Sequence, residues 1–236
     1  MPAPIQSDFL EIAILLYEGM TALDAIGPYE VLSRLPNTKI KLVAKEPGLV
    51  VTDTRYLALN ATDSLTDVPT PNVILLPGGS AGTMKTTQNQ AVLDWVRTAH
   101  ANTQWTTAVC TGVFLLGASG LLTGIEATTH WASTADLAKY DARYQPARFV
   151  QSGKIITAAG VSAGIDMALY LAGQLRGEQV AKAIQLAIEY DPNPPFQSGS
   201  LKKADQEIVQ QSRKLLRSWF LDEFQKFFPD QAIPKL

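Results

Sequence analysis

The chain is poor in the residues that hold metals or form covalent cross-links: it has one cysteine and two histidines among 236 residues. A single cysteine excludes an intramolecular disulfide and fits a reducing compartment. The three side chains lie in unrelated segments, so they do not form the ligand cluster that zinc requires. We therefore expect no metal site.

Long apolar runs are also absent, as is a charged stretch leading into an apolar segment of the kind that begins a signal peptide. These absences predict a cytoplasmic protein with no membrane partner, and residues Met1–Phe9 are expected to form a short leader. The formal net charge of −2 provides no overall attraction to nucleic acid or to acidic lipid.

The chain does contain enough apolar material for a full core, with 46% hydrophobic and 18% charged residues. Short β-branched runs alternate with segments of helical periodicity, which predicts an α/β fold built on a mostly parallel sheet. At this length we expect a single domain over residues 1–236. Within it, residues 202–228 should form a C-terminal amphipathic helical extension.

The apolar residues of this extension fall near one predicted helical face. They are Ile208, Leu215, Leu216, Trp219, Phe220 and Phe224. Such a face packs either on its own domain or on a partner subunit, because it would otherwise leave a large exposed apolar patch. The sequence leaves both alternatives open.

The only cysteine lies between a predicted strand, residues 105–109, and a predicted helix opening at Gly112. With almost no loop between the two, Cys110 should occupy a tight, strained turn similar in layout to the nucleophile elbow of hydrolases. The helix N-terminus would favour the thiolate. The alternative is a buried structural cysteine, since free cysteine is among the most buried residue types.

A second turn lies upstream, where the apolar strand 73–76 ends in Pro77-Gly78-Gly79-Ser80. Glycines at the carboxyl end of a central strand allow backbone N–H groups to face a ligand. The amides of Gly79 and Thr111 could then form an oxyanion site. Alternatively, the two glycines only permit a sharp bend.

These motifs together resemble the ThiJ/PfpI superfamily, within the class I glutamine-amidotransferase-like fold, and more narrowly its isonitrile hydratase branch. The matching pieces are Leu23-Asp24, Gly27-Pro28-Tyr29-Glu30-Val31-Leu32, Leu76-Pro77-Gly78-Gly79, Val109-Cys110-Thr111-Gly112, Ala127-Thr128-Thr129-His130-Trp131-Ala132-Ser133, Gly164-Ile165-Asp166, and Glu189-Tyr190 followed by Pro194-Pro195-Phe196. The resemblance implies a flavodoxin-like fold, a homodimer, and an acidic residue, Asp24, that faces the cysteine. It also places His130 in the pocket.

Local sequence offers a structural alternative for both of these residues. Asp24 lies at a predicted helix start, where an aspartate serves well as an N-cap. His130 could be a core histidine held by hydrogen bonds. The resemblance, not the spacing, gives them a functional role.

By resemblance, the expected activity is hydration of an isonitrile to the N-substituted formamide. Cys110 would attack the isonitrile carbon, Asp24 would donate a proton to it, and Thr111 would contribute its amide and its hydroxyl, with no metal or organic cofactor. Alternatives are another cysteine enzyme of the superfamily, glyoxalase-like or amidase-like, and a redox or ligand sensor without turnover. Some AraC-type regulators carry a similar sensor domain, but the short, weakly basic tail here disfavours DNA binding.

Overall fold

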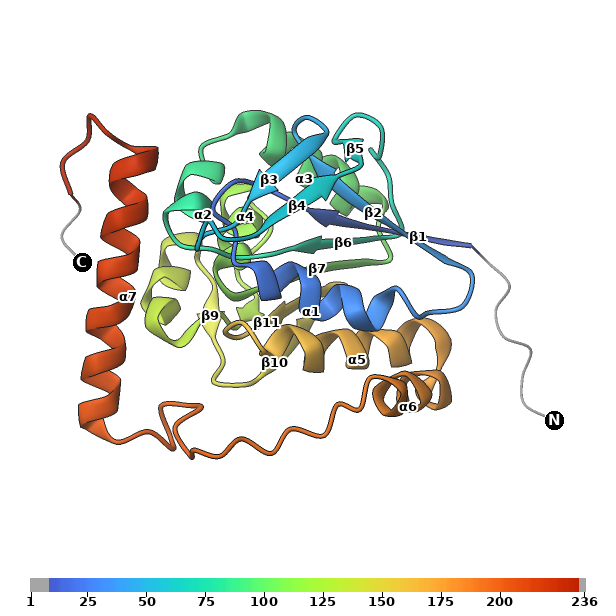
Figure 1. The fold of residues 1–236 in the computed structure, drawn as a ribbon. Helices are drawn as coiled ribbons and strands as arrows, with labels where there is room; N and C mark the ends of the chain where they lie inside the picture. Colours follow the sequence, from blue (N-terminus) through green and yellow to red (C-terminus); the bar gives the residue numbers. More distant parts are fainter. Residues whose placement is uncertain (1–8, 234–236) are drawn as a thin grey trace.

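The computed structural model describes residues 9–233, and the expected leader lies almost entirely outside this range. A seven-stranded sheet runs through the middle of the molecule in the order β10-β11-β7-β6-β1-β2-β5 (Figure 1). Its strands are β1 (Leu10–Leu15), β2 (Thr38–Ala44), β5 (Asp63–Ser64), β6 (Val73–Leu76), β7 (Trp105–Val109), β10 (Phe149–Ser152) and β11 (Ile155–Ala158). Every neighbouring pair is parallel except β10 with β11. The predicted mostly parallel α/β sheet is thus confirmed.

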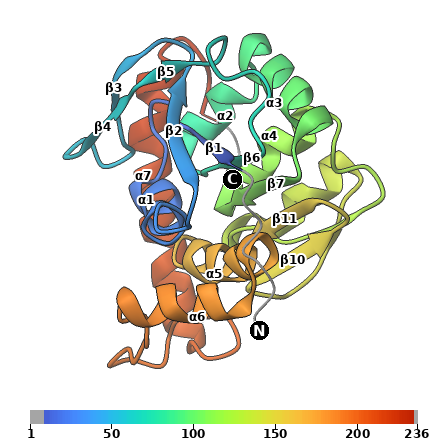
Figure 2. The same cartoon turned by 90° about the vertical axis from the view of Figure 1, so that its right-hand side faces the viewer.

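Helices cover both faces of this sheet, with α1, α5 and α6 on one side and α3 and α4 on the other (Figure 2). The helices are α1 (Ala22–Leu32), α2 (Ala81–Thr86), α3 (Gln90–Asn102), α4 (Val113–Ala118), α5 (Ala163–Arg176), α6 (Glu178–Ala187) and α7 (Gln206–Phe227), with 3-10 turns η1 (Cys110–Gly112) and η2 (Trp131–Tyr140). Two small two-stranded sheets lie outside the main one: β3 (Gly48–Val51) with β4 (Ala58–Ala61), and β8 (Glu126–Ala127) with β9 (Arg143–Tyr144).

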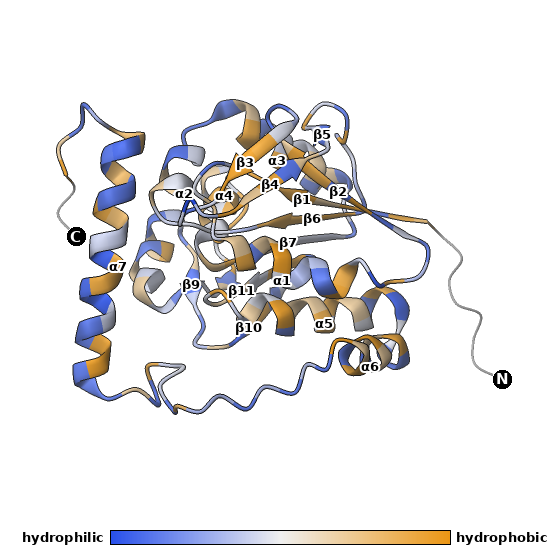
Figure 3. Cartoon of the chain, viewed as in Figure 1, coloured by the Kyte–Doolittle hydropathy of each residue, from blue (hydrophilic) through white to orange (hydrophobic). Residues whose placement is uncertain are grey.

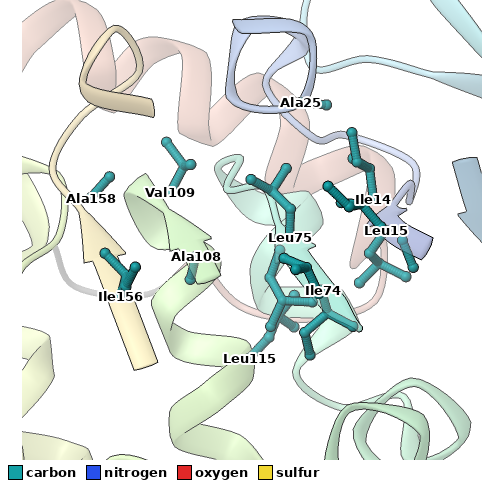
Figure 4. Close-up of a cluster of buried hydrophobic side chains, with 14 of the residues drawn as sticks. Ile14, Leu15, Ala25, Ile74, Leu75, Ala108, Val109, Leu115, Ile156 and Ala158 are labelled. Atoms are coloured by element: carbon teal, nitrogen blue, oxygen red, sulfur yellow. The ribbon is translucent and has the colours of Figure 1, made fainter. Parts of the chain in front are cut away.

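The central strands are buried on both faces, which explains why their sequences are continuously apolar rather than alternating. Ile14 in β1 lies beside Leu42 in β2 and Leu75 in β6. Figure 4 shows side chains of these central strands meeting in the core, with Leu115 of α4 against them. This rigid centre holds the turns at the carboxyl ends of the strands in place.

Helix α1 begins earlier than the sequence predicts. It starts at Ala22 with Thr21 as N-cap, so Asp24 is not at its start, and Pro28 lies inside it. Pro28 is buried against Gly164 of α5, and the packing of the two helices offsets the backbone hydrogen bond that proline cannot make.

The C-terminal extension is a helix, α7, that begins at Gln206 after a stretch without regular structure. Its apolar residues do not share one face, because adjacent positions are about 100° apart around a helix. Phe224 is buried and Leu216 is half-buried, but Leu215 and Trp219 are 53% and 62% exposed. Figure 3 shows the resulting alternation of apolar and polar bands along α7.

Within residues 9–233, no helix is both long enough and apolar enough to cross a membrane.

Candidate active site

Four turns at the carboxyl ends of parallel strands meet around the cysteine. They follow β1, β6, β7 and β11, which are neighbours in the sheet. Strand β2, which follows β1 in the chain, pairs with one side of β1, and the later strands β6 and β7 extend the sheet from its other side. The strand order therefore reverses between β1 and β6, which makes this a topological switch point. In open parallel sheets, ligands bind in the crevice at such a point. The fold therefore brings the residues selected from the sequence to the expected edge.

Cys110 has the strained turn that the sequence predicts. Its φ of 58° is in the left-handed region, which is uncommon for residues other than glycine. Its amide donates to the carbonyl of Ala159 at 3.0 Å, and Thr129 Oγ1 donates to the carbonyl of Cys110 at 2.8 Å. These bonds hold a backbone conformation that costs on the order of 1–3 kcal/mol, a kind of strain that clusters at functional sites.

The thiol is 5% exposed, and its electrostatics differ from the sequence-based expectation. Burial raises the pKa of Cys110 well above its usual value, and the neighbouring Asp24 raises it further. The amides of Thr111 and Val161 donate hydrogen bonds toward Sγ and lower this pKa, but their effect is smaller. The expectation that the helix terminus alone would favour the thiolate is wrong, because the loss of solvent outweighs the local dipoles.

Asp24 is completely buried, and it is not the N-cap of α1. Its Oδ2 accepts a hydrogen bond from the amide of Gly78 at 2.9 Å. Gly78 is required here, because a Cβ at this position would lie 2.6 Å from the amide nitrogen of Thr111 and 2.9 Å from Asp24 Oδ2. The capping alternative is therefore wrong, and the carboxyl group faces the turn after β6.

The second carboxyl oxygen of Asp24, Oδ1, is buried and has no hydrogen-bond partner among residues 9–233. Burial raises the pKa of Asp24 to about 7, partly offset by hydrogen bonds from the Gly78 amide and from Cys110. A buried oxygen without a partner is costly as a charged group but not as a protonated one. Asp24 is thus suited to hold a proton near neutral pH beside the thiol.

The amide and the hydroxyl of Thr111 point to different partners. Its amide is directed at the sulfur, as expected, but its hydroxyl accepts from the amide of Gly79 at 3.0 Å and donates to the carbonyl of the same residue. The hydroxyl therefore holds the turn after β6 and has no proton left for a ligand. The Gly79 amide is likewise engaged by Thr111, so the donors at the sulfur are the amides of Thr111 and Val161.

Val161 was not identified from the sequence. It follows β11 and has a φ of 25°, a rare conformation for a β-branched residue, which directs its amide toward Cys110. The available signal was the small-residue turn Ala159-Gly160 after an apolar strand, at the same sheet edge as the other turns.

His130 lies at the side of the site. Its ring packs against Gly160, the residue before Val161, and its Nδ1 accepts from the amide of Ala132 at 3.3 Å. Burial lowers the pKa of His130, which favours the neutral imidazole. Within residues 9–233, no three His, Cys, Asp or Glu side chains are grouped as they would be around a metal ion.

Residues 10–174 match the model of the DJ-1/PfpI family. The chain belongs to the DJ-1/PfpI family. Isonitrile hydratase from Pseudomonas putida is 42% identical over 205 residues, covering 87% of this chain and 89% of that protein.

Solved structures of DJ-1/PfpI proteins agree with the fold. A THiJ/PfpI family protein from Pseudomonas syringae is 33% identical, with a TM-score of 0.87 over 97% of both chains. DJ-1beta of Drosophila melanogaster, at 20% identity and a TM-score of 0.72, covers 78% of this chain and all of its own, and it supports the fold alone. The predicted family and the flavodoxin-like architecture are confirmed.

Proposed function

We propose that the protein is an enzyme that hydrates isonitriles to N-substituted formamides. The observation that carries the proposal is the pairing of a single thiol with a buried carboxyl group whose pKa is raised to about 7. The terminal carbon of an isonitrile must accept both a nucleophile and a proton, and this pair supplies both. The 42% identity to the Pseudomonas putida isonitrile hydratase points to the same substrate class.

The first step joins the thiol to the substrate. The sulfur of Cys110 attacks the terminal carbon of R–NC while the thiol proton passes to Asp24 and from Asp24 to the same carbon. One S–C bond and one C–H bond form, which gives the thioimidate R–N=CH–S–Cys. Nucleophile and general acid thus act on a single carbon.

The second step releases the product. Water adds across the C=N bond, and collapse of the adduct breaks the C–S bond, returns the thiol and releases R–NH–CHO. Amide donors from Thr111 and Val161 would stabilise negative charge on the departing sulfur. No oxidant, metal or organic cofactor enters this balance.

A panel of substrates tests the proposal. Purified protein should convert simple alkyl isonitriles steadily to formamides and should leave amides and 2-oxoaldehydes largely unchanged. Turnover of an amide or an oxoaldehyde instead would indicate another kind of cysteine enzyme. Reversible oxidation of Cys110 with no turnover of any of the three would indicate a redox sensor, a role that the raised pKa of the thiol disfavours.

A further inference from the structure

Helix α7 crosses the sheet edge at which Cys110 lies. Figure 1 shows it standing beyond the arrowheads of β1 and β6, and in Figure 2 it runs behind α1 and α5. Because the turns that form the site follow these strands, α7 lies on the side from which a small molecule approaches them. Contacts near its C-terminal end and at Arg213, in its first half, define this position.

One end of α7 is fixed to the turns after β1 and β6. Glu223 Oε2 accepts from the amide of Ala81 at 2.8 Å, and Lys226 forms an ion pair with Glu18. Gly19 has a φ of 80°, a left-handed conformation that favours glycine, and Glu223 packs closely over it, since a Cβ there would lie 2.3 Å from Glu223 Oε1. These contacts lie beside the turn that holds Gly78 against Asp24.

A second contact of α7, made by Arg213, lies on the opposite side of the site, near His130. The guanidinium of Arg213 is 5.1 Å from the ring centroid of Trp131, and that ring is 5.5 Å from the ring of His130. His130 in turn packs on Gly160, next to Val161. At 1.5 Å per residue, the helix covers about 15 Å between Arg213 and Glu223, so it spans the site from one wall to the other.

Along the face that carries these contacts, α7 presents an apolar inner row. Val209, Leu216 and Phe220 are half-buried and continue, at intervals of four or seven residues, the face that buries Phe224. Among residues 9–233, Val209 and Leu216 pack against neither hydrophobic cluster of the protein. They are partly shielded from water without being part of a core, as expected of side chains that line the path of a ligand.

We infer that α7 forms the outer wall of the substrate site, and that Leu216 contacts the N-substituent of the substrate and selects for size and for apolar character. This inference rests on the proposed function for the identity of the substrate. The position of the wall does not depend on it. Leu216 lies between the two contacts, three residues after Arg213 and seven before Glu223, and it is half-buried on the inner face of the helix.

The test compares Leu216→Trp with Leu215→Trp, an identical change on the outer face of the same turn. We would measure kcat/KM for isonitriles with small and bulky alkyl substituents. Leu216→Trp should lower the bulky-to-small ratio by roughly tenfold or more, in line with the discrimination that one or two carbon atoms provide in an apolar pocket. Leu216→Ala should raise this ratio, and Leu215→Trp should leave it unchanged.

A second readout requires no isonitrile chemistry. The rate of alkylation of Cys110 is measured with iodoacetamide and with a bulky N-aryl maleimide, together with the melting temperature of each variant. If α7 forms the wall, Leu216→Trp should slow alkylation by the maleimide relative to iodoacetamide, and Leu216→Ala should accelerate it. Equal rate ratios in all folded variants would overturn the inference. A change in these rate ratios, in a protein that does not turn over isonitriles, would support the position of α7 and contradict only the proposed function.

Discussion

Asp24 and Cys110 are both buried acids, and burial raises the pKa of each. Because two negative charges would be costly in this environment, the pair carries one proton over a wide pH range above neutrality, and its titration belongs to the pair. Moving that proton from sulfur to carboxyl creates nucleophile and general acid together. At the scale of the residue, this coupling is the basis of the proposed chemistry.

Replacing Asp24 with asparagine should separate its chemical role from its structural one. The amide keeps an acceptor for the Gly78 amide at the position of Oδ2 but cannot deliver a proton. We expect single-turnover formamide formation to fall by roughly two to four orders of magnitude, the usual contribution of a positioned acid or base. The melting temperature should change by only a few degrees.

The matched control for this change is Asp94→Asn, on the surface of α3, which should keep normal turnover. Near-normal turnover in Asp24→Asn itself would reduce Asp24 to a structural residue. The acid role would then pass to His130 or to water.

The pH dependence of turnover follows from the same pair. Below the pKa of Asp24, about 7, both groups are protonated; above it, one proton is lost and the reactive singly charged pair forms. We therefore expect kcat/KM to rise as the pH increases through about 7 and then to level off, because the pKa of the thiol is raised. A rate that falls through neutrality would mean that the fully protonated pair is the active form.

The sequence predicts the positions of site residues that belong to a motif. It does not predict their pKa values. Cys110 at a strand-to-helix turn could be identified from residue order alone. The direction of its pKa shift could not, because desolvation depends on elements from the whole chain. Val161 could not be identified for a related reason. Its role depends on a positive φ, and a valine in the sequence does not predict that conformation.

At the scale of the element, Glu223 connects α7 to the start of α2. Burial raises its pKa to about 7 from the usual 4.5, and its Oε1 has no hydrogen-bond partner in the described part of the chain. A carboxyl whose pKa is higher in the folded state destabilises the fold once it ionises. Stability should therefore decline as pH rises from about 4.5 through about 7.

Glu223→Gln should reduce this decline, since glutamine can still accept from the Ala81 amide and carries no charge. We expect its melting temperature to fall less than that of the wild type between about pH 5 and 8, by roughly 2–4 °C for each kcal/mol of ionisation cost removed. Thermal unfolding at the two pH values measures this difference. Parallel curves for the two proteins would show that the ionisation of Glu223 does not affect stability.

Two central strands were predicted well because their signal is local. The strands β6 and β7 follow directly from the apolar and β-branched residues 73–76 and 105–109. Helix α2 was not predicted: it has six residues, without apolar periodicity, and its first amide is satisfied by Glu223, 142 residues away. Elements stabilised by such distant partners leave little signal in their own sequence.

At the scale of the whole molecule, the outer face of α7 exposes large apolar side chains. Trp219 and Leu215 on this face are more than half exposed, as is Phe196 in the irregular stretch before α7. The family resemblance and this apolar surface together predict a homodimer. Light scattering at micromolar concentration should give the mass of two chains.

Trp219→Glu should then shift the protein toward the monomer, whereas Ser218→Glu, an equally charged change beside it, should have little effect. A monomeric wild type would contradict the prediction of a dimer. A dimer unaffected by Trp219→Glu would place the interface elsewhere.

The central claim is that Cys110 hydrates isonitriles through a covalent adduct, and acid quenching of a single turnover, analysed by intact-protein mass and by formamide yield, tests it most directly. We predict a transient mass increase equal to that of the whole isonitrile, located on Cys110, followed by one equivalent of formamide. Cys110→Ala should remain folded and show neither, because loss of a nucleophile costs orders of magnitude in rate while this small change at a turn costs little stability. Formamide production by the cysteine-free protein, or no production by the wild type, would contradict the account.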